Sequence, residues 1–152
     1  MRIVIGSDHA GFALKQHLLG WLTEHGHEVT DLGAYSEDPT DYPRYGALVA
    51  RAVADGAADR GVAVCGSGQG ICMAANKVPG VRGGVIRDVR DAQMTRRHND
   101  ANVACFGERF TEPQVATAAL EVFLATEFEG GRHARRVGEL ADLDATHGRA
   151  EL

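Results

Sequence analysis

Short apolar segments alternate with amphipathic segments along most of the chain. The apolar segments are rich in β-branched residues and are bounded by glycine or polar residues, which is typical of buried strands. They span residues 2–7, 28–32, 61–65, 81–86 and 102–106. The segments that follow them have apolar residues three and four positions apart, which predicts helices. These helices are expected at residues 12–25, 45–58, 71–77, 89–98 and 112–126.

This strict alternation indicates the fold class. Because the strands are almost continuously apolar, we expect a parallel sheet with helices on both faces, which is an α/β architecture. The remaining segment, residues 130–152, is polar except for Val137, Leu140 and Leu143. A helix with so few apolar residues has little to bury on its own chain, so we expect this helical tail to pack on a partner subunit. Residues 1–152 are expected to form one domain.

Composition and charge narrow the class of protein further. The chain has 152 residues, 44% of them hydrophobic, which suits a globular domain that buries about two thirds of its unfolded surface. No apolar run approaches the ~18 residues of a membrane span, and we expect no signal peptide. The net charge of -5 predicts no basic surface for nucleic acid. Three cysteines without a disulfide spacing predict reduced thiols and a cytoplasmic protein.

A glycine-rich loop follows the third predicted strand, and binding sites of open parallel sheets form at such carboxyl ends. The loop consists of Gly66, Ser67, Gly68, Gln69 and Gly70. Three glycines let several backbone N–H groups point into one concavity that can hold an anion, whereas a simple tight turn would need only one. The loop matches neither G-x-G-x-x-G nor G-x-S-x-G, which argues against dinucleotide binding and against a hydrolase nucleophile.

A cysteine directly precedes this loop. Cys65 lies where a helix N-terminus and oriented amides would stabilise a thiolate, so it is either a reactive base or a small buried side chain. Cys72 and Cys105 fall inside predicted elements, and we expect both in the core. The spacing between Cys65 and Cys72 does not suit a zinc site, so no metal is expected.

Polar residues also end two other elements. Asp8 and His9 end the first strand, where they would contact a ligand or cap the next helix. His98, Asn99 and Asp100 end a helix before the fifth strand. We expect this connection to face the carboxyl edge of the sheet, where His98 would perform acid–base chemistry near neutral pH.

Three arginines complete the set of candidates. Arg109 follows the fifth strand, and Arg132 and Arg136 are four residues apart in the tail, on one face of a helix. Such a pair either clamps a phosphate group or forms an ordinary solvated basic face. An amide loop, a cysteine, histidines and arginines together suit proton transfer on a small phosphorylated substrate without a cofactor.

Five segments of the chain, in order, resemble the B-type ribose-5-phosphate isomerases, a family that includes the galactose-6-phosphate isomerase subunits. They read GSDHAG, TDYP, CGSGQGICMAANKVPGVRG, RRHNDANVACFGER and EGGRHARRV. The resemblance implies an aldose–ketose isomerase of the pentose phosphate pathway with a Rossmann-like three-layer α/β/α sandwich. It also implies a homodimer or homotetramer whose active sites are shared between two chains.

The same resemblance assigns roles to individual residues. Cys65 matches the base that moves a proton between C2 and C1 through a cis-enediolate, and His98 matches the residue that opens the sugar ring. The amides of residues 66–70 match a loop that stabilises the developing oxyanion. Sugar contacts are implied for Asp8, His9, Tyr42 and Asn99, and phosphate or substrate contacts for Arg109, Arg132 and Arg136, some from the partner subunit.

The substrate is narrowed by details of these segments. One branch of the family has a glutamate base at the position that Ile71 holds here, so this chain resembles the branch with a cysteine base. The cysteine, His9 and the GGRHARRV segment favour ribose 5-phosphate. The same chemistry on a hexose 6-phosphate or a tetrose phosphate stays open, as does a non-catalytic sugar-phosphate sensor. The presence of both Cys65 and His98 argues against a sensor, which needs neither proton-transfer group.

Overall fold

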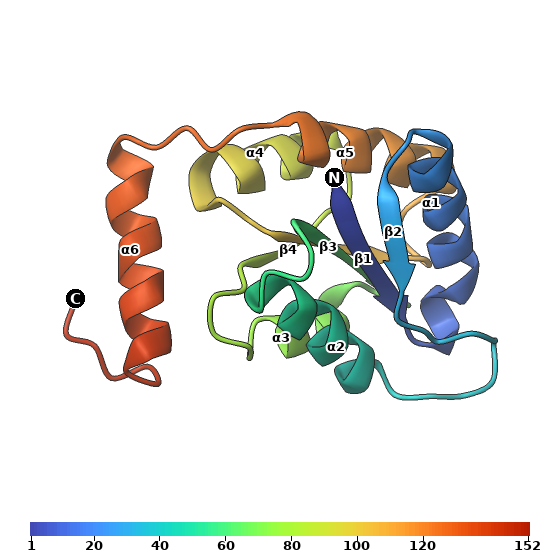
Figure 1. The fold of residues 1–152 in the computed structure, drawn as a ribbon, viewed down its shortest axis with the longest axis horizontal. Helices are drawn as coiled ribbons and strands as arrows, with labels where there is room; N and C mark the ends of the chain where they lie inside the picture. Colours follow the sequence, from blue (N-terminus) through green and yellow to red (C-terminus); the bar gives the residue numbers. More distant parts are fainter.

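The computed structural model describes all 152 residues and contains one five-stranded sheet (Figure 1). The strands are β1 (Arg2–Ser7), β2 (Glu28–Asp31), β3 (Arg60–Cys65), β4 (Gly83–Val85) and β5 (Val103–Gly107). All neighbours pair in parallel, in the order β2-β1-β3-β5-β4. The predicted parallel α/β fold is confirmed.

Helices cover both faces of this sheet, as Figure 1 shows. Helices α1, α4 and α5 lie on one face, and α2 and α3 lie on the other. A short 3-10 turn, η1 (His9–Gly11), precedes α1. The helices span α1 (Phe12–Glu24), α2 (Tyr42–Ala54), α3 (Gln69–Ala75), α4 (Val89–Asn99), α5 (Pro113–Ala125) and α6 (Arg132–Ala145).

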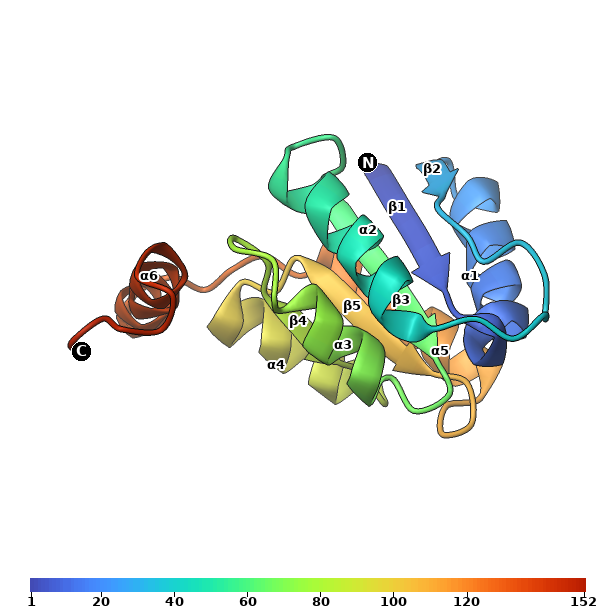
Figure 2. The same cartoon turned by 90° about the horizontal axis from the view of Figure 1, so that it is seen from below.

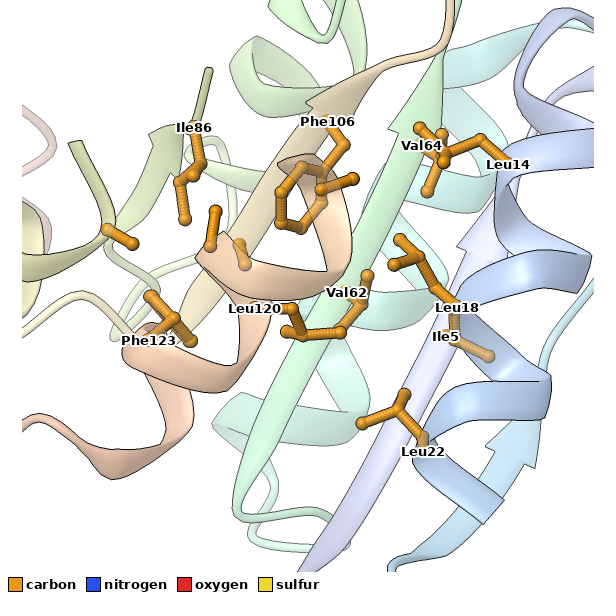
Figure 3. Packing of buried hydrophobic residues seen from close by; sticks show 14 of the residues in the cluster. Ile5, Leu14, Leu18, Leu22, Val62, Val64, Ile86, Phe106, Leu120 and Phe123 are labelled. Atoms are coloured by element: carbon orange, nitrogen blue, oxygen red, sulfur yellow. The ribbon is translucent and has the colours of Figure 1, made fainter. Parts of the chain in front are cut away.

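Two hydrophobic cores hold these layers together. On one face Leu18 of α1 and Leu120 of α5 pack against Val62 and other residues of the sheet (Figure 3). On the other face Val49 of α2 and Ile71 of α3 are fully buried. Residues of β1, β3 and β5 alternate between the two cores, which explains why these strands are apolar almost throughout, whereas the edge strand β2 is largely polar and has no fully buried residue. Full burial of one such leucine or isoleucine contributes about 1.5–3 kcal/mol.

The strand order brings three loops to one edge of the sheet. Strand β5 lies between β3 and β4, so the chain that leaves β3 through α3 passes over the position that β5 later fills. Cys65 is paired with Gly107, and Ser7 is paired with Val64. The carboxyl ends of β1, β3 and β5 therefore lie side by side, and the segments that follow them meet.

Helix α2 begins at Tyr42, earlier than the predicted start at residue 45. Pro43 lies in its first turn, and Asp41 is the extended residue before the helix. Proline has a fixed φ and no N–H, both of which suit the first turn of a helix. Tyr42 is therefore held at a helix start instead of in the preceding loop.

Helix α6 stands apart from the body of the molecule (Figure 2). His133 is its one buried residue, whereas Leu140 is exposed and Val137 and Leu143 are half-buried. The expected helical tail is present, and its packing on a partner subunit stays a prediction. None of the helices combines the length and the apolar character that crossing a membrane requires.

Candidate active site

A cavity of about 260 Å³ lies where the carboxyl ends of β1 and β3 meet the loop after β5. Every residue that lines it, except Ala10, is a candidate from the sequence. The lining consists of Asp8, His9, Ala10, Tyr42, Cys65, Gly66, Ser67, Gly70 and Arg109. The structure thus brings together the polar ends of two strands, the glycine-rich loop and one of the three arginines.

Cys65 ends β3 at the bottom of the glycine-rich loop. Its side chain is 4% exposed, and its Sγ accepts a hydrogen bond of 3.1 Å from the backbone N–H of Gly68. An amide donor at this position stabilises a thiolate more than a thiol, because hydrogen bonds to charged acceptors are the stronger ones. Cys65 is thus held against a donor and also lines an open cavity, as a base requires.

Glycines are needed for the shape of this loop. Gly68 has φ +77°, and a Cβ there would lie 3.0 Å from the backbone of Phe106 and Gly107. A Cβ on Gly107 would lie 2.5 Å from the backbone of Ser67. The loops after β3 and β5 therefore touch through glycines, and a side chain at either position would separate them.

Three amides of the loop are free to bind a ligand. The N–H of Gln69 donates to Ser67 Oγ at 3.2 Å, and that of Gly68 donates to Cys65. The N–H groups of Gly66, Ser67 and Gly70 have no acceptor within the chain, and all three residues line the cavity. They are the amides that can stabilise an oxyanion beside Cys65.

Asp8 and His9 form the wall that follows β1. Asp8 is buried, and its carboxylate accepts the N–H of Gly11 at 3.0 Å, so it caps the η1 turn as well as lining the cavity. Nδ1 of His9 lies 3.0 Å from the carbonyl oxygen and 3.1 Å from the nitrogen of Thr40. The backbone of Thr40 therefore fixes the imidazole, which leaves Nε2 without a partner in the chain.

Tyr42 and Arg109 form two further walls, and each packs on a glycine. A Cβ on Gly70 would lie 2.7 Å from the ring of Tyr42, and a Cβ on Gly66 would lie 3.0 Å from the guanidinium of Arg109. Arg109 is the only lysine or arginine that lines the cavity. A phosphate dianion in this cavity would therefore have one cationic partner from this chain.

His98 and Asn99 lie elsewhere, which corrects one prediction. Helix α4 returns the chain from the carboxyl end of β4 to the amino end of β5, which begins at Val103. Val103 is paired with Gly61, and Gly107 is paired with Cys65. The two pairs are four residues apart along the strands, so the start of β5 lies roughly 13 Å from Cys65. The expectation that this connection faces the carboxyl edge is wrong, because a helix that leaves that edge must end at the opposite one.

Arg132 and Arg136 lie near His98 and not near Cys65. Both are on the first turns of α6, and the intervening His133 stacks on His98 with ring centroids 4.3 Å apart. Gln69 also does not line the cavity around Cys65, since its side chain borders two neighbouring cavities instead. The candidates thus form two groups, one around Cys65 and one around His98.

Some residues near the site had no predicted role. Thr40 lies in the TDYP segment and holds the His9 ring through its backbone atoms, a role that no sequence pattern reveals. Glu108 accepts the N–H of Leu14 at 2.9 Å and so ties the loop after β5 to the start of α1. His133 lies between the candidate arginines Arg132 and Arg136, but the sequence does not indicate that it is buried.

The two other cysteines are buried, as expected. A hydrogen bond with Cys105 lowers the pKa of Cys72, with a further contribution from Asn76. The same hydrogen bond, together with burial, raises the pKa of Cys105, which therefore remains a thiol. Neither lines the cavity around Cys65.

The most plausible metal ligands are His98, Glu129 and His133, whose ligand atoms lie within 4.8 Å of one another. The two imidazole planes are only 13° from parallel, so the lone pairs in these planes do not converge on one point. Glu129 is already paired with Arg97 at 2.8 Å, and Arg132 contacts His133. Parallel rings and two neighbouring cations make this cluster unsuitable for a metal ion.

Comparisons with known proteins find relatives along nearly the whole chain. A family described as Ribose/Galactose Isomerase matches residues 3–140. Ribose-5-phosphate isomerase B of Escherichia coli (strain K12) is 43% identical over 94% of this chain and 96% of its own length. The structure of Clostridium thermocellum ribose-5-phosphate isomerase B is similar with a TM-score of 0.95, at 44% identity over 97% of this chain and 99% of that one. D-erythrulose-4-phosphate isomerase of Pectobacterium atrosepticum is 38% identical over 92% of this chain and 93% of its own length.

Proposed function

Because this chain belongs to the ribose/galactose isomerase family and is an aldose–ketose isomerase, we propose that it interconverts ribose 5-phosphate and ribulose 5-phosphate. Relatives named ribose-5-phosphate isomerase B, which match nearly the full length, support this substrate. One observation carries the chemistry. The cavity at the carboxyl edge of the sheet presents a cysteine beside three free backbone amides.

Cys65 is the base in this proposal. Its thiolate removes the proton from C2 of the open-chain aldose, the C2–H electrons form a double bond between C2 and C1, and the negative charge moves to O1. A proton then passes from O2 to O1, C1 takes the proton back from the Cys65 thiol, and O2 becomes the ketose carbonyl. The Gly68 N–H, 3.1 Å from Sγ, supports the thiolate between these two transfers.

The free amides of Gly66, Ser67 and Gly70 stabilise the cis-enediolate. Donors that are already oriented toward the developing charge lower the barrier without reorganising during the reaction. The glycine contacts between this loop and the loop after β5 keep these donors in place. Asp8, His9 and Tyr42 line the rest of the cavity and are proposed to hold the sugar hydroxyls.

A second copy of the chain supplies the remaining groups in this proposal. Arg109 alone is a weak partner for a phosphate dianion, and the group of His98, Arg132 and Arg136 has no cysteine and no amide loop of its own. Helix α6 has 14 residues, a length at which an isolated helix is marginal, and its apolar side chains are only partly covered within the chain. We propose that α6 packs on a partner in a homodimer or homotetramer, which places His98, Asn99 and these arginines beside the partner's cysteine.

The base is tested by Cys65→Ala. We expect turnover of ribose 5-phosphate to fall by at least about 100-fold, because a positioned base contributes 10²–10⁴-fold, while calorimetric binding of the substrate persists. Incorporation of solvent deuterium at C1 of ribulose 5-phosphate should also stop. A variant that turns over at a near-normal rate would remove Cys65 from this role.

The shared site is tested by mixing two inactive proteins. Cys65→Ala and Arg136→Ala subunits that exchange with each other should regenerate activity, because one site of each mixed dimer then has both an intact cysteine and an intact arginine. Subunit exchange is checked independently with two differently tagged chains. If the subunits exchange and no activity returns, the arginine serves its own chain.

A tetrose phosphate is the second candidate substrate, because the relative from Pectobacterium atrosepticum is named D-erythrulose-4-phosphate isomerase. Its similarity is lower than that of the E. coli ribose-5-phosphate isomerase B, which favours the pentose. Parallel assays with ribose 5-phosphate, erythrulose 4-phosphate and a hexose 6-phosphate decide between them.

A further inference from the structure

His133 is the one buried residue of α6, although the helix also has several aliphatic side chains that remain accessible. It is 5% exposed and lies in the first turn of the helix. Burial of an imidazole in place of an available aliphatic side chain needs a reason, since a polar ring loses hydration when it is buried. The reason is found in what the ring touches.

The ring of His133 lies flat against the ring of His98. Their centroids are 4.3 Å apart and their planes differ by 13°. The ring nitrogens of His98 have no hydrogen-bond partner in the chain, so no polar contact sets the orientation of this imidazole. The stack covers one face of the His98 ring and leaves its nitrogen-bearing edge free.

Several contacts hold His133 itself in place. Its backbone N–H donates to Gly130 at 3.0 Å, and Nε of Arg132 lies 3.5 Å from its Nε2. Glu129 approaches the same nitrogen at 3.9 Å and is tied to Arg97, the neighbour of His98, through its side chain and its backbone N–H. The segment that carries His133 is therefore fastened to the last turn of α4, directly beside His98.

The charges around His133 favour its neutral form. Burial lowers its pKa, and the charges of His98, Arg132 and Arg136 lower it further, against the opposing effect of Glu129. Arg97 adds another positive charge on the far side of Glu129. A neutral ring can stack on His98 whether or not His98 carries a proton, whereas two imidazolium rings in contact would repel each other.

We propose that His133 is a positioning residue, whose flat ring holds the imidazole of His98 in the orientation that opens the sugar ring. This inference rests on the proposed function and on the role of His98 within it. Stacked rings share no N–H···N hydrogen bond, so His133 passes no proton to His98. The role needs an aromatic plane and not a second acid or base.

Three substitutions at His133 distinguish a role of its aromatic ring in positioning from a role in proton transfer. His133→Ala removes the ring, His133→Phe keeps a ring without nitrogen, and His133→Gln keeps hydrogen-bonding capacity without a ring. We expect His133→Ala to lower kcat on ribose 5-phosphate by about 10- to 100-fold and His133→Phe to stay within about threefold of the parent. His133→Gln should resemble His133→Ala. The reverse order, with His133→Gln active and His133→Phe inactive, would overturn the proposal.

A second substrate distinguishes positioning from a general structural role. Ribulose 5-phosphate has its O5 phosphorylated and cannot close a five-membered ring, so exchange of its C1 proton with solvent needs Cys65 but no ring opening. All three His133 variants should keep this exchange within about threefold of the parent. Equal losses with both sugars, or a raised KM alone, would show that His133 only holds α6 and its arginines.

His98→Asn serves as the reference for the proposed function. If that variant shows the split between the two sugars and His133→Ala does not, the inference about His133 fails and the proposed function stands. If the parent protein turns over neither sugar, the proposed function itself fails. Thermal unfolding of each variant checks that the fold is retained.

Discussion

The N–H of Gly68 is the one donor that the structure directs at the sulfur of Cys65, and the substitution Gly68→Ala tests the importance of this hydrogen bond. Gly68 has φ +77°, and a Cβ at this position would meet the backbone of Gly107 at 3.0 Å. Gly68→Ala therefore has two costs. The left-handed conformation costs an alanine roughly 1–2 kcal/mol, and the close contact pushes the loop away from β5 and with it the N–H away from Cys65.

The effect on turnover follows from the lost hydrogen bond. A hydrogen bond to a charged group is worth about 1.5–3 kcal/mol, and each 1.36 kcal/mol corresponds to about tenfold in rate. We therefore expect kcat for ribose 5-phosphate to fall by about 10- to 100-fold, with a smaller change in KM. The assay is steady-state isomerisation, accompanied by unfolding in denaturant to measure the loss of stability.

Gly26→Ala is the matched control. Gly26 has φ +79°, nearly the same backbone conformation, but a Cβ there would meet nothing within 4 Å, and it lies between α1 and β2. This variant should lose about the same 1–2 kcal/mol of stability and keep its kcat. If Gly68→Ala behaves like Gly26→Ala, with reduced stability and unchanged turnover, the Gly68 amide does not support the base.

Other features of the molecule lead to further tests. Lys15 is fully buried with its ammonium 2.7 Å from Asp31, so Asp31→Asn should lower the free energy of unfolding in denaturant by about 3–5 kcal/mol. Asp59→Asn, which breaks the exposed pair with Arg2, should lower it little. Equal losses of stability in the two variants would contradict the role of burial. Burial lowers the pKa of His27, whose Nδ1 has no hydrogen-bond partner, so the unfolded chain binds more protons than the folded one and stability should fall as the pH drops below about 6.5. This fall should be smaller in His27→Asn, and an identical pH profile would refute the assignment. Ribose 5-phosphate should exceed allose 6-phosphate and galactose 6-phosphate in kcat/KM by at least about tenfold, because a displaced phosphate loses a charge-assisted hydrogen bond; a faster hexose would refute the substrate.

The element types could be predicted because each has a local physical cause. Leu14, Leu18 and Leu22 recur at helical spacing and are all buried on one side of α1. The strand order could not be predicted in the same way. Strands β1, β3 and β5 are apolar on both faces, so the pattern does not show which of them are neighbours, and the place of β5 between β3 and β4 depends on packing between distant segments.

The site around Cys65 was predictable for a topological reason. Parallel strands end at the same edge, so Asp8, the loop after Cys65 and Arg109 had to approach one another once the sheet was parallel. The same rule also predicts that a segment between a helix and the next strand lies at the opposite edge. Applied to His98 and Asn99, it would have avoided the wrong placement of that connection.

The two groups of candidates differ in what each can do chemically. The cavity around Cys65 has a cysteine and free amides but a single cation, and the group around His98 has arginines and an imidazole but no cysteine. Nothing in one chain joins them, since they lie at opposite edges of the sheet and the helix that carries Arg132 and Arg136 stands apart from the body (Figure 2). A sugar phosphate whose phosphate group is bound by these arginines must have its reacting carbons near a cysteine. If a second chain brings these two halves together, the length of the substrate is set by an interface and not by a single cavity. Substitutions on the apolar side of α6 would then change substrate preference without touching any residue that binds the sugar.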